Sequence, residues 1–256
     1  MNTIYLIIFF IFGASMGSFY GVIGERLPRN ESFIKGRSHC NSCHHTLHFL
    51  DLIPILSYII NKGKCRYCKK DIPVMLPILE LTTGLLYSVS FYSYGLSLDL
   101  LIALGVVSLL MIVMVSDLLY YIIPDEVIIF FSFYFIIIEY LKLGFNGVCN
   151  HIVTGFFLFL LMYLIMLMGS LFFKKESLGG GDVKLLFIFG LVLEPILGVL
   201  TIFIGSLIAL PVALYILYKN KEHMIPFGPF LIVSFALIYF SKLTTDGFLR
   251  FITFNQ

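Results

Sequence analysis

Long apolar stretches, separated by short polar segments, run along most of the chain. A stretch of about 18 or more apolar residues predicts a transmembrane helix, because that length crosses the hydrocarbon core of a bilayer. A last stretch at 247–254 is too short to cross. The pattern therefore predicts an all-α polytopic membrane protein of about eight transmembrane helices, near 4–23, 74–94, 98–116, 125–143, 151–173, 183–197, 199–218 and 226–241.

The composition supports a membrane protein. Apolar residues make up 59% of the chain and charged residues 12%, and the mean hydropathy is +0.99. A soluble domain with a large core would need far more polar surface, since about a quarter of the residues of such domains are charged. The formal net charge of +2 gives no basic field for nucleic acid, so we expect no nucleic-acid partner.

The basic residues predict the orientation in the membrane. Nine of the 17 lysines and arginines lie between Arg26 and Lys70, and none precedes Arg26. The lack of an early basic segment argues against a cleaved signal peptide. Positive residues gather in cytoplasmic loops, so we expect an outside N-terminus and a cytoplasmic loop at 24–73.

Four of the five cysteines form two pairs in this loop, Cys40 with Cys43 and Cys65 with Cys68. Two CxxC pairs bring four thiolates around one zinc ion, and four protein ligands make such a site structural. The spacing predicts a small zinc-knuckle-like domain. The alternative is two disulfides, which rarely persist in the cytoplasm. Four histidines near the first pair are alternative zinc ligands that could replace a thiolate: His39, His44, His45 and His48.

Two carboxylates are hard to explain by stability alone. Asp117 ends an apolar span, where the helix dipole disfavours negative charge. Asp182 follows Gly179–Gly181, and its structural explanation is a helix N-cap. Two predicted spans separate the two residues, which places both at the same membrane face. A pair of close carboxylates shares one proton and supplies an acid and a base for peptide hydrolysis.

Several motifs occur in the order known from one family. They are the GSF and RLP sequences within Gly17–Pro28, the cysteine loop with Asp51–Cys65, PxxExxTG at Pro77–Gly84, Asp117 ahead of Pro124-Asp125, and GxGDxK at Gly179–Lys184. With them the chain resembles the bacterial type IV prepilin peptidases, a group of GxGD membrane aspartic proteases. The resemblance covers nearly the whole length.

The resemblance implies a catalytic dyad of Asp117 and Asp182, with Gly179, Gly181 and Lys184 in the supporting loop. The substrates would be prepilins or pseudopilins inserted in the membrane, cleaved after a glycine between a basic leader and a hydrophobic helix. Proteolysis by two carboxylates needs no cofactor. The expected location is the bacterial cytoplasmic membrane, with the active site at its cytoplasmic face. The oligomeric state is not predicted.

The same resemblance implies two regions. Residues 1–94 would carry the first two spans, the four-cysteine loop and an S-adenosylmethionine-dependent N-methyltransferase activity, and residues 95–256 would form a six-helix protease domain. Gly21 stands where the family usually has Asn, which weakens the methyltransferase expectation more than the protease one.

Three other functions compete with this interpretation. A transporter or channel would use the carboxylates as an ion path, and it predicts carboxylates spread through the membrane depth. It would also leave the cysteine loop unexplained. The second is a GxGD protease with some other substrate, such as signal-peptide remnants, whereas the cysteine loop favours the prepilin class. A non-catalytic scaffold would tolerate Asp182→Asn without loss of function.

Overall fold

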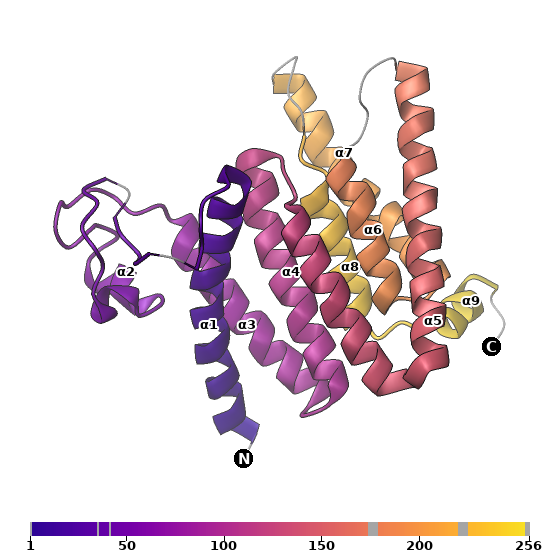
Figure 1. The fold of residues 1–256 in the computed structure, drawn as a ribbon, viewed down its shortest axis with the longest axis horizontal. Coiled ribbons are helices and arrows are strands. Elements are labelled where there is room, and N and C mark those ends of the chain that lie inside the picture. Colours follow the sequence, from indigo (N-terminus) through magenta and orange to yellow (C-terminus); the bar gives the residue numbers. More distant parts are fainter. Residues whose placement is uncertain (1, 35, 41, 174–178, 220–224, 254–256) are drawn as a thin grey trace. The chain divides into compact units, whose positions relative to one another are not determined.

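The computed structural model describes residues 2–34, 36–40, 42–173, 179–219 and 225–253 (Figure 1). Within these ranges the regular elements are helices, and the extended pairings are two isolated bridges in the loop after the first helix. The predicted all-α fold is confirmed. The chain divides into two compact units, Met1–Leu96 and Ser97–Gln256.

The first unit is a pair of long helices with the cysteine loop between them. The loop has little regular structure and folds around short helical turns. The elements in chain order are α1 (Asn2–Arg26), η1 (Leu27–Arg29), η2 (Phe49–Leu52), α2 (Leu56–Ile60) and α3 (Met75–Tyr94).

Small residues let α1 and α3 approach closely. A Cβ atom on Gly17 would lie 2.7 Å from Thr83 Oγ1, so a larger residue does not fit at this crossing. Small residues at such crossings are typical of helix pairs in membranes, where close van der Waals packing drives association. Near the crossing, the hydroxyls of Tyr20 and Tyr87 share a buried 2.7 Å hydrogen bond.

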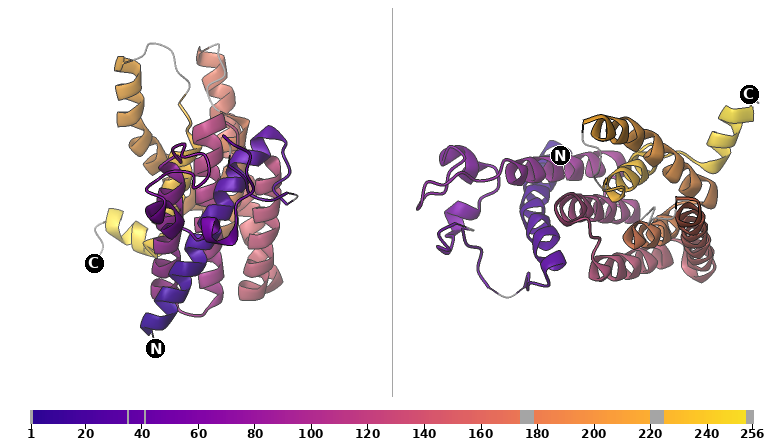
Figure 2. Two further views of the ribbon diagram at one scale, coloured as in Figure 1. Left: turned by 90° about the vertical axis from the view of Figure 1, so that its left-hand side faces the viewer. Right: turned by 90° about the horizontal axis from the view of Figure 1, so that it is seen from above.

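The second unit is a helix bundle, seen nearly end-on in the right-hand view of Figure 2. Its most buried helices, α4, α6 and α8, carry aliphatic and aromatic residues on almost every face. Among them, Phe189 and Phe235 stack with ring centroids 4.3 Å apart. The elements are α4 (Leu98–Tyr120), α5 (Asp125–Phe173), α6 (Gly180–Val192), α7 (Pro195–Lys219), α8 (Gly228–Phe240) and α9 (Thr245–Thr253).

Helix α5 is two helices joined by a sharp turn. Gly144 has φ 72° and ψ −173°, which no helix allows and which glycine adopts without steric cost. Figure 1 shows the helix turning back on itself. The two arms correspond to the spans predicted at 125–143 and 151–173.

Four helices of the described chain are long and apolar enough to cross a membrane: Thr3–Arg29, Leu98–Tyr120, Asp125–Phe172 and Pro195–Lys219. Helices α6 and α8 have 13 residues each, about 20 Å at 1.5 Å per residue. That is shorter than a hydrocarbon core of about 30 Å. A count of eight crossings therefore stays a prediction.

Candidate active site and four-cysteine site

Asp117 lies in the last turn of α4, and its side chain is 6% exposed. The helix ends at Tyr120, and its C-cap Tyr121 has a left-handed conformation (φ 57°) and donates its backbone N–H to the Asp117 carbonyl at 3.0 Å. The Asp117 Oδ2 atom is buried, and it has no hydrogen-bond partner in the part of the chain that the structure describes. A buried, unpaired carboxylate oxygen is costly, and such groups need an explanation in function.

Asp182 lies in the first turn of α6 and is also 6% exposed. The N-cap of this helix is Gly179, whose carbonyl accepts the Asp182 backbone N–H at 3.1 Å. The interpretation of Asp182 as an N-cap is therefore wrong, since its carboxylate is three residues inside the helix. Negative charge in a first turn is nevertheless favoured by the helix dipole.

Gly228, the first residue of α8, brings the two carboxylates together. A Cβ atom on Gly228 would lie 2.7 Å from Asp117 Oδ2 and 3.2 Å from Asp182 Oδ1. Two atoms at these distances from one point are at most about 6 Å apart, where like charges affect each other's ionisation strongly. Gly228 is not among the site residues predicted from the sequence. A signal exists in Pro226-Phe227-Gly228-Pro229, where a glycine between two prolines opens an apolar span.

The glycines of the loop before Asp182 differ in how closely they are packed. A Cβ atom on Gly181 would lie 2.9 Å from Ile123 Cβ, whereas one on Gly179 would meet only Asp182 Oδ2, at 3.5 Å. Among the described residues, no atom lies within 4 Å of a Cβ atom on Gly180. Of the three glycines, Gly181 is the one whose described neighbours exclude a side chain.

Lys184 is directed to the start of α5 and forms an ion pair there. Its Nζ lies 2.6 Å from Asp125 Oδ1, and both side chains are exposed. Asp125 lies in the first turn of α5, as the proline before it predicts. The pair links the beginnings of α5 and α6, and an exposed pair of this kind is worth about 0–1 kcal/mol.

The four paired cysteines gather in one cluster in the first unit. The sulfurs of Cys40, Cys43, Cys65 and Cys68 all lie within 4.8 Å of one another. Cys40 Sγ and Cys68 Sγ are 3.9 Å apart, close to the roughly 3.8 Å between sulfurs of a tetrahedral zinc site with 2.3 Å bonds. All five cysteines are described, and none forms a disulfide. The donor set fits a zinc ion.

The two CxxC turns have matching backbones. The Cys40 N–H donates to the His45 carbonyl at 3.0 Å, and the Cys65 N–H donates to the Lys70 carbonyl at 2.8 Å. In each turn the residue four after the first cysteine has positive φ. The N–H groups of Cys43 and Ser42 lower the pKa of the Cys40 thiol to about 6, which favours the thiolate that binds metal.

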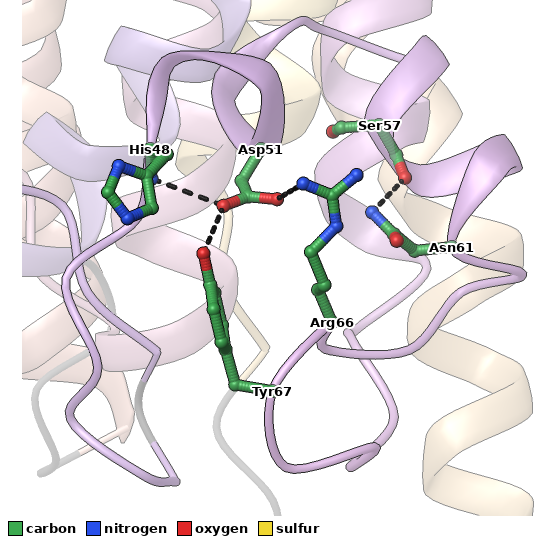
Figure 3. Close-up of polar contacts among 6 residues, drawn as sticks. All are labelled: His48, Asp51, Ser57, Asn61, Arg66 and Tyr67. Carbon is green, nitrogen blue, oxygen red and sulfur yellow. Dashed lines mark hydrogen bonds and ion pairs between the residues drawn. The ribbon is translucent and has the colours of Figure 1, made fainter.

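Asp51 connects the segments around the two cysteine pairs (Figure 3). Its Oδ2 accepts the His48 backbone N–H and the Tyr67 hydroxyl, both at 3.1 Å. Its Oδ1 lies 3.5 Å from Arg66 Nη1. Desolvation and the Asp51 carboxylate raise the pKa of the Tyr67 hydroxyl, so it remains a donor. Asp51 thus has a structural role that its loop position did not reveal.

Two further carboxylates of the predicted spans, Glu80 and Glu139, have different surroundings. Glu80 in α3 accepts the backbone N–H of Ile55 at 2.7 Å, and Ile55 has φ 63°, which is unusual for a β-branched residue. Glu80 thereby holds the cysteine loop onto α3. Glu139 in α5 is 2% exposed, and its Oε2 has no hydrogen-bond partner within the described ranges.

Comparison with known proteins decides the family. A sequence model described as the bacterial peptidase A24 N-terminal domain matches residues 11–94, and a model of the type IV leader peptidase family matches residues 104–214. A relative from Bacillus subtilis, named prepilin leader peptidase/N-methyltransferase, is 36% identical over 91% of this chain and 93% of its own. The chain belongs to the type IV leader peptidase family.

Other members of the family carry the same name. The relative from Vibrio cholerae is 30% identical over 94% of this chain and 98% of its own. The relative from Myxococcus xanthus is 31% identical over 78% of this chain and 60% of its own. No solved structure matches the chain. The resemblance seen in the sequence motifs is confirmed.

Proposed function

We propose that this member of the type IV leader peptidase family is an aspartic endopeptidase that removes the leader peptides of prepilins or pseudopilins. The observation that carries the assignment of its active site is the meeting of Asp117 and Asp182 at Gly228. The names of the relatives support the substrate class. The proposed location of cleavage is the cytoplasmic face of the bacterial inner membrane.

The two carboxylates supply the whole hydrolytic step in this proposal. One is ionised and takes a proton from water, whose oxygen bonds to the carbonyl carbon of the substrate. The other carries a proton and gives it to the leaving nitrogen as the carbon–nitrogen bond breaks. Two carboxylates so close do not both ionise readily, so the pair holds one proton in its resting state. No covalent intermediate and no cofactor are needed.

A second activity, methylation of the new N-terminal amine, belongs to residues 1–94 in this proposal. The relatives' names include N-methyltransferase, and S-adenosylmethionine would supply the methyl group. The four cysteines would hold zinc in a structural role, because four thiolates leave no open position for a substrate.

The transporter alternative receives less support from the geometry. It requires carboxylates spread along a path through the membrane. The carboxylates of Asp117 and Asp182, at the ends of two helices, instead both lie next to the Cβ position of Gly228. An acid–base pair is the chemistry that this arrangement serves best.

The test is cleavage of a co-expressed candidate prepilin, with leader removal followed by mass spectrometry. Asp117→Asn and Asp182→Asn each remove the acid–base function while nearly keeping volume. Both variants should accumulate full-length precursor, since such catalysis contributes about 10²–10⁴-fold to the rate. Asp125→Asn is the matched control, because Asp125 is an exposed aspartate outside the pair, and it should still cleave.

Three results would count against the proposal. Cleavage at the wild-type rate by either dyad variant would remove that residue from the active site. An intact precursor with the wild type would reject the substrate class. A product without the mass of one added methyl group, formed in the presence of the methyl donor, would reject the second activity alone.

A further inference from the structure

Ile123 lies against both glycines that border the two carboxylates. It belongs to the short connection between α4 and α5, and it is 7% exposed. A Cβ atom on Gly181 would lie 2.9 Å from Ile123 Cβ, and one on Gly228 would lie 3.0 Å from Ile123 Cδ1. The Ile123 side chain therefore fills space next to Asp117 and Asp182.

The surroundings of the dyad leave little room for a substrate side chain. Both carboxylates are 6% exposed. A Cβ atom built on Gly228 would lie 2.7 Å from Asp117 Oδ2, 3.2 Å from Asp182 Oδ1 and 3.0 Å from Ile123 Cδ1, so Ile123 and both carboxylates border the same small space. A peptide bond that reaches the carboxylates brings the flanking residue against this side chain. A residue without a side chain fits there, and each added carbon must displace Ile123.

The backbone around Ile123 restricts how far this residue can move. The preceding turn is fixed by Tyr121, whose N–H donates to the Asp117 carbonyl at 3.0 Å. Ile123 directly precedes Pro124, and a proline restricts the residue before it to extended conformations. The β-branched side chain itself has few rotamers. The backbone and the χ1 angle of Ile123 are therefore both restricted.

We propose that Ile123 is a specificity-determining residue, which restricts the substrate residue beside the cleaved bond to the size of glycine. The inference rests on the proposed peptidase function and deepens it. It predicts that a smaller residue at position 123 admits substrates that the wild type rejects.

The experiment compares two synthetic precursors, each with a basic leader and a hydrophobic helix. They differ only in having glycine or alanine before the cleaved bond. The measured quantity is the ratio of kcat/KM for the alanine precursor to that for the glycine precursor, with the full-length protein in vesicles. Ile123→Val removes only the Cδ1 methyl that faces Gly228. The ratio should rise about tenfold or more, the effect of one methylene in an apolar pocket.

Ile123→Ala opens the same space further and should raise the ratio more than Ile123→Val. Ile122→Ala is the matched control, because Ile122 is the adjacent isoleucine and is 48% exposed. Its ratio should equal that of the wild type. Since a ratio is compared, a partial loss of folded protein does not affect the result.

An unchanged ratio in both Ile123 variants would overturn the inference while wild-type cleavage of the glycine precursor left the proposed function standing. An equal rise of the kcat/KM ratio in Ile122→Ala would also overturn the inference, because the effect would then not be specific to Ile123. Failure of the wild type to cleave the glycine precursor would reject the peptidase function and the inference together. Loss of cleavage of both precursors by folded Ile123→Val would contradict a role in selectivity.

Discussion

Gly228→Ala tests whether the meeting of the two carboxylates is what makes the site active. The added Cβ would lie 2.7 Å from Asp117 Oδ2 and 3.2 Å from Asp182 Oδ1. Carbon and oxygen atoms without a bond between them stay more than 3 Å apart, so at least one carboxylate must move. Because these oxygens are the atoms proposed to react, their displacement should lower the rate of peptide hydrolysis directly.

The size of the effect follows from this displacement. Overpacking of a buried site costs about 1–3 kcal/mol of stability, which leaves a folded protein in most cases. Misplacement of reacting groups by about 1 Å costs about 10²-fold in rate. We therefore expect Gly228→Ala to lower prepilin cleavage by ten- to a hundred-fold, estimated as a roughly half-ångström to one-ångström shift, with a smaller loss of thermal stability.

The assay is the rate of leader removal by purified protein in vesicles, together with the thermal midpoint of each variant. Gly180→Ala is the matched control, since a Cβ atom there would meet no atom of the described residues within 4 Å. It makes the same change in the same active-site region and should cleave at close to the wild-type rate. Equal rates for Gly228→Ala and Gly180→Ala would refute the reasoning, because the carboxylates would then tolerate a displacement that should disable them.

Two further predictions concern the first unit. Glu80→Ala removes the acceptor for the Ile55 N–H at a cost of about 1.5–3 kcal/mol, typical of a hydrogen bond to a charged group. Limited proteolysis should then cut the cysteine loop faster than in the wild type, while leader removal continues. Equal cutting rates would contradict the anchoring role of Glu80. Elemental analysis should find one zinc ion per chain. The Cys40→Ser variant should lose this zinc, and the control variant Cys149→Ser should keep it. Zinc bound to Cys40→Ser at the wild-type level would contradict the four-thiolate site.

The carboxylate pair could be predicted from the sequence because it depends on the number of apolar spans between the two residues and not on how the helices pack. Two predicted apolar spans lie between Asp117 and Asp182, and this number predicts that both residues lie at one membrane face. The contact with Gly228 could not be predicted in this way. It depends on how α8 packs between α4 and α6, and no local pattern in the sequence carries that information.

The helix lengths show a similar limit. Apolar content suggested a span at 183–197, yet α6 ends at Val192. Leu193 is already extended, with φ −107° and ψ 153°, and Glu194 precedes a proline, which disfavours a helical residue at that position. Hydropathy measures burial rather than crossing, and a short helix buried among others is as apolar as one that meets lipid.

The ends of three helices explain why a carboxylate is tolerated at Asp117. The C-terminal end of α4 disfavours negative charge, so this position is unfavourable within its own helix. The N-terminal ends of α6 and α8 lie beside it, at Asp182 and Gly228. Such ends carry unpaired backbone N–H groups and partial positive charge, and they are natural sites for an anion. The absence of a side chain on Gly228 brings the end of α8 within reach of both acids. The arrangement favours one negative charge shared by two carboxyl groups, which is the state that acid–base hydrolysis requires.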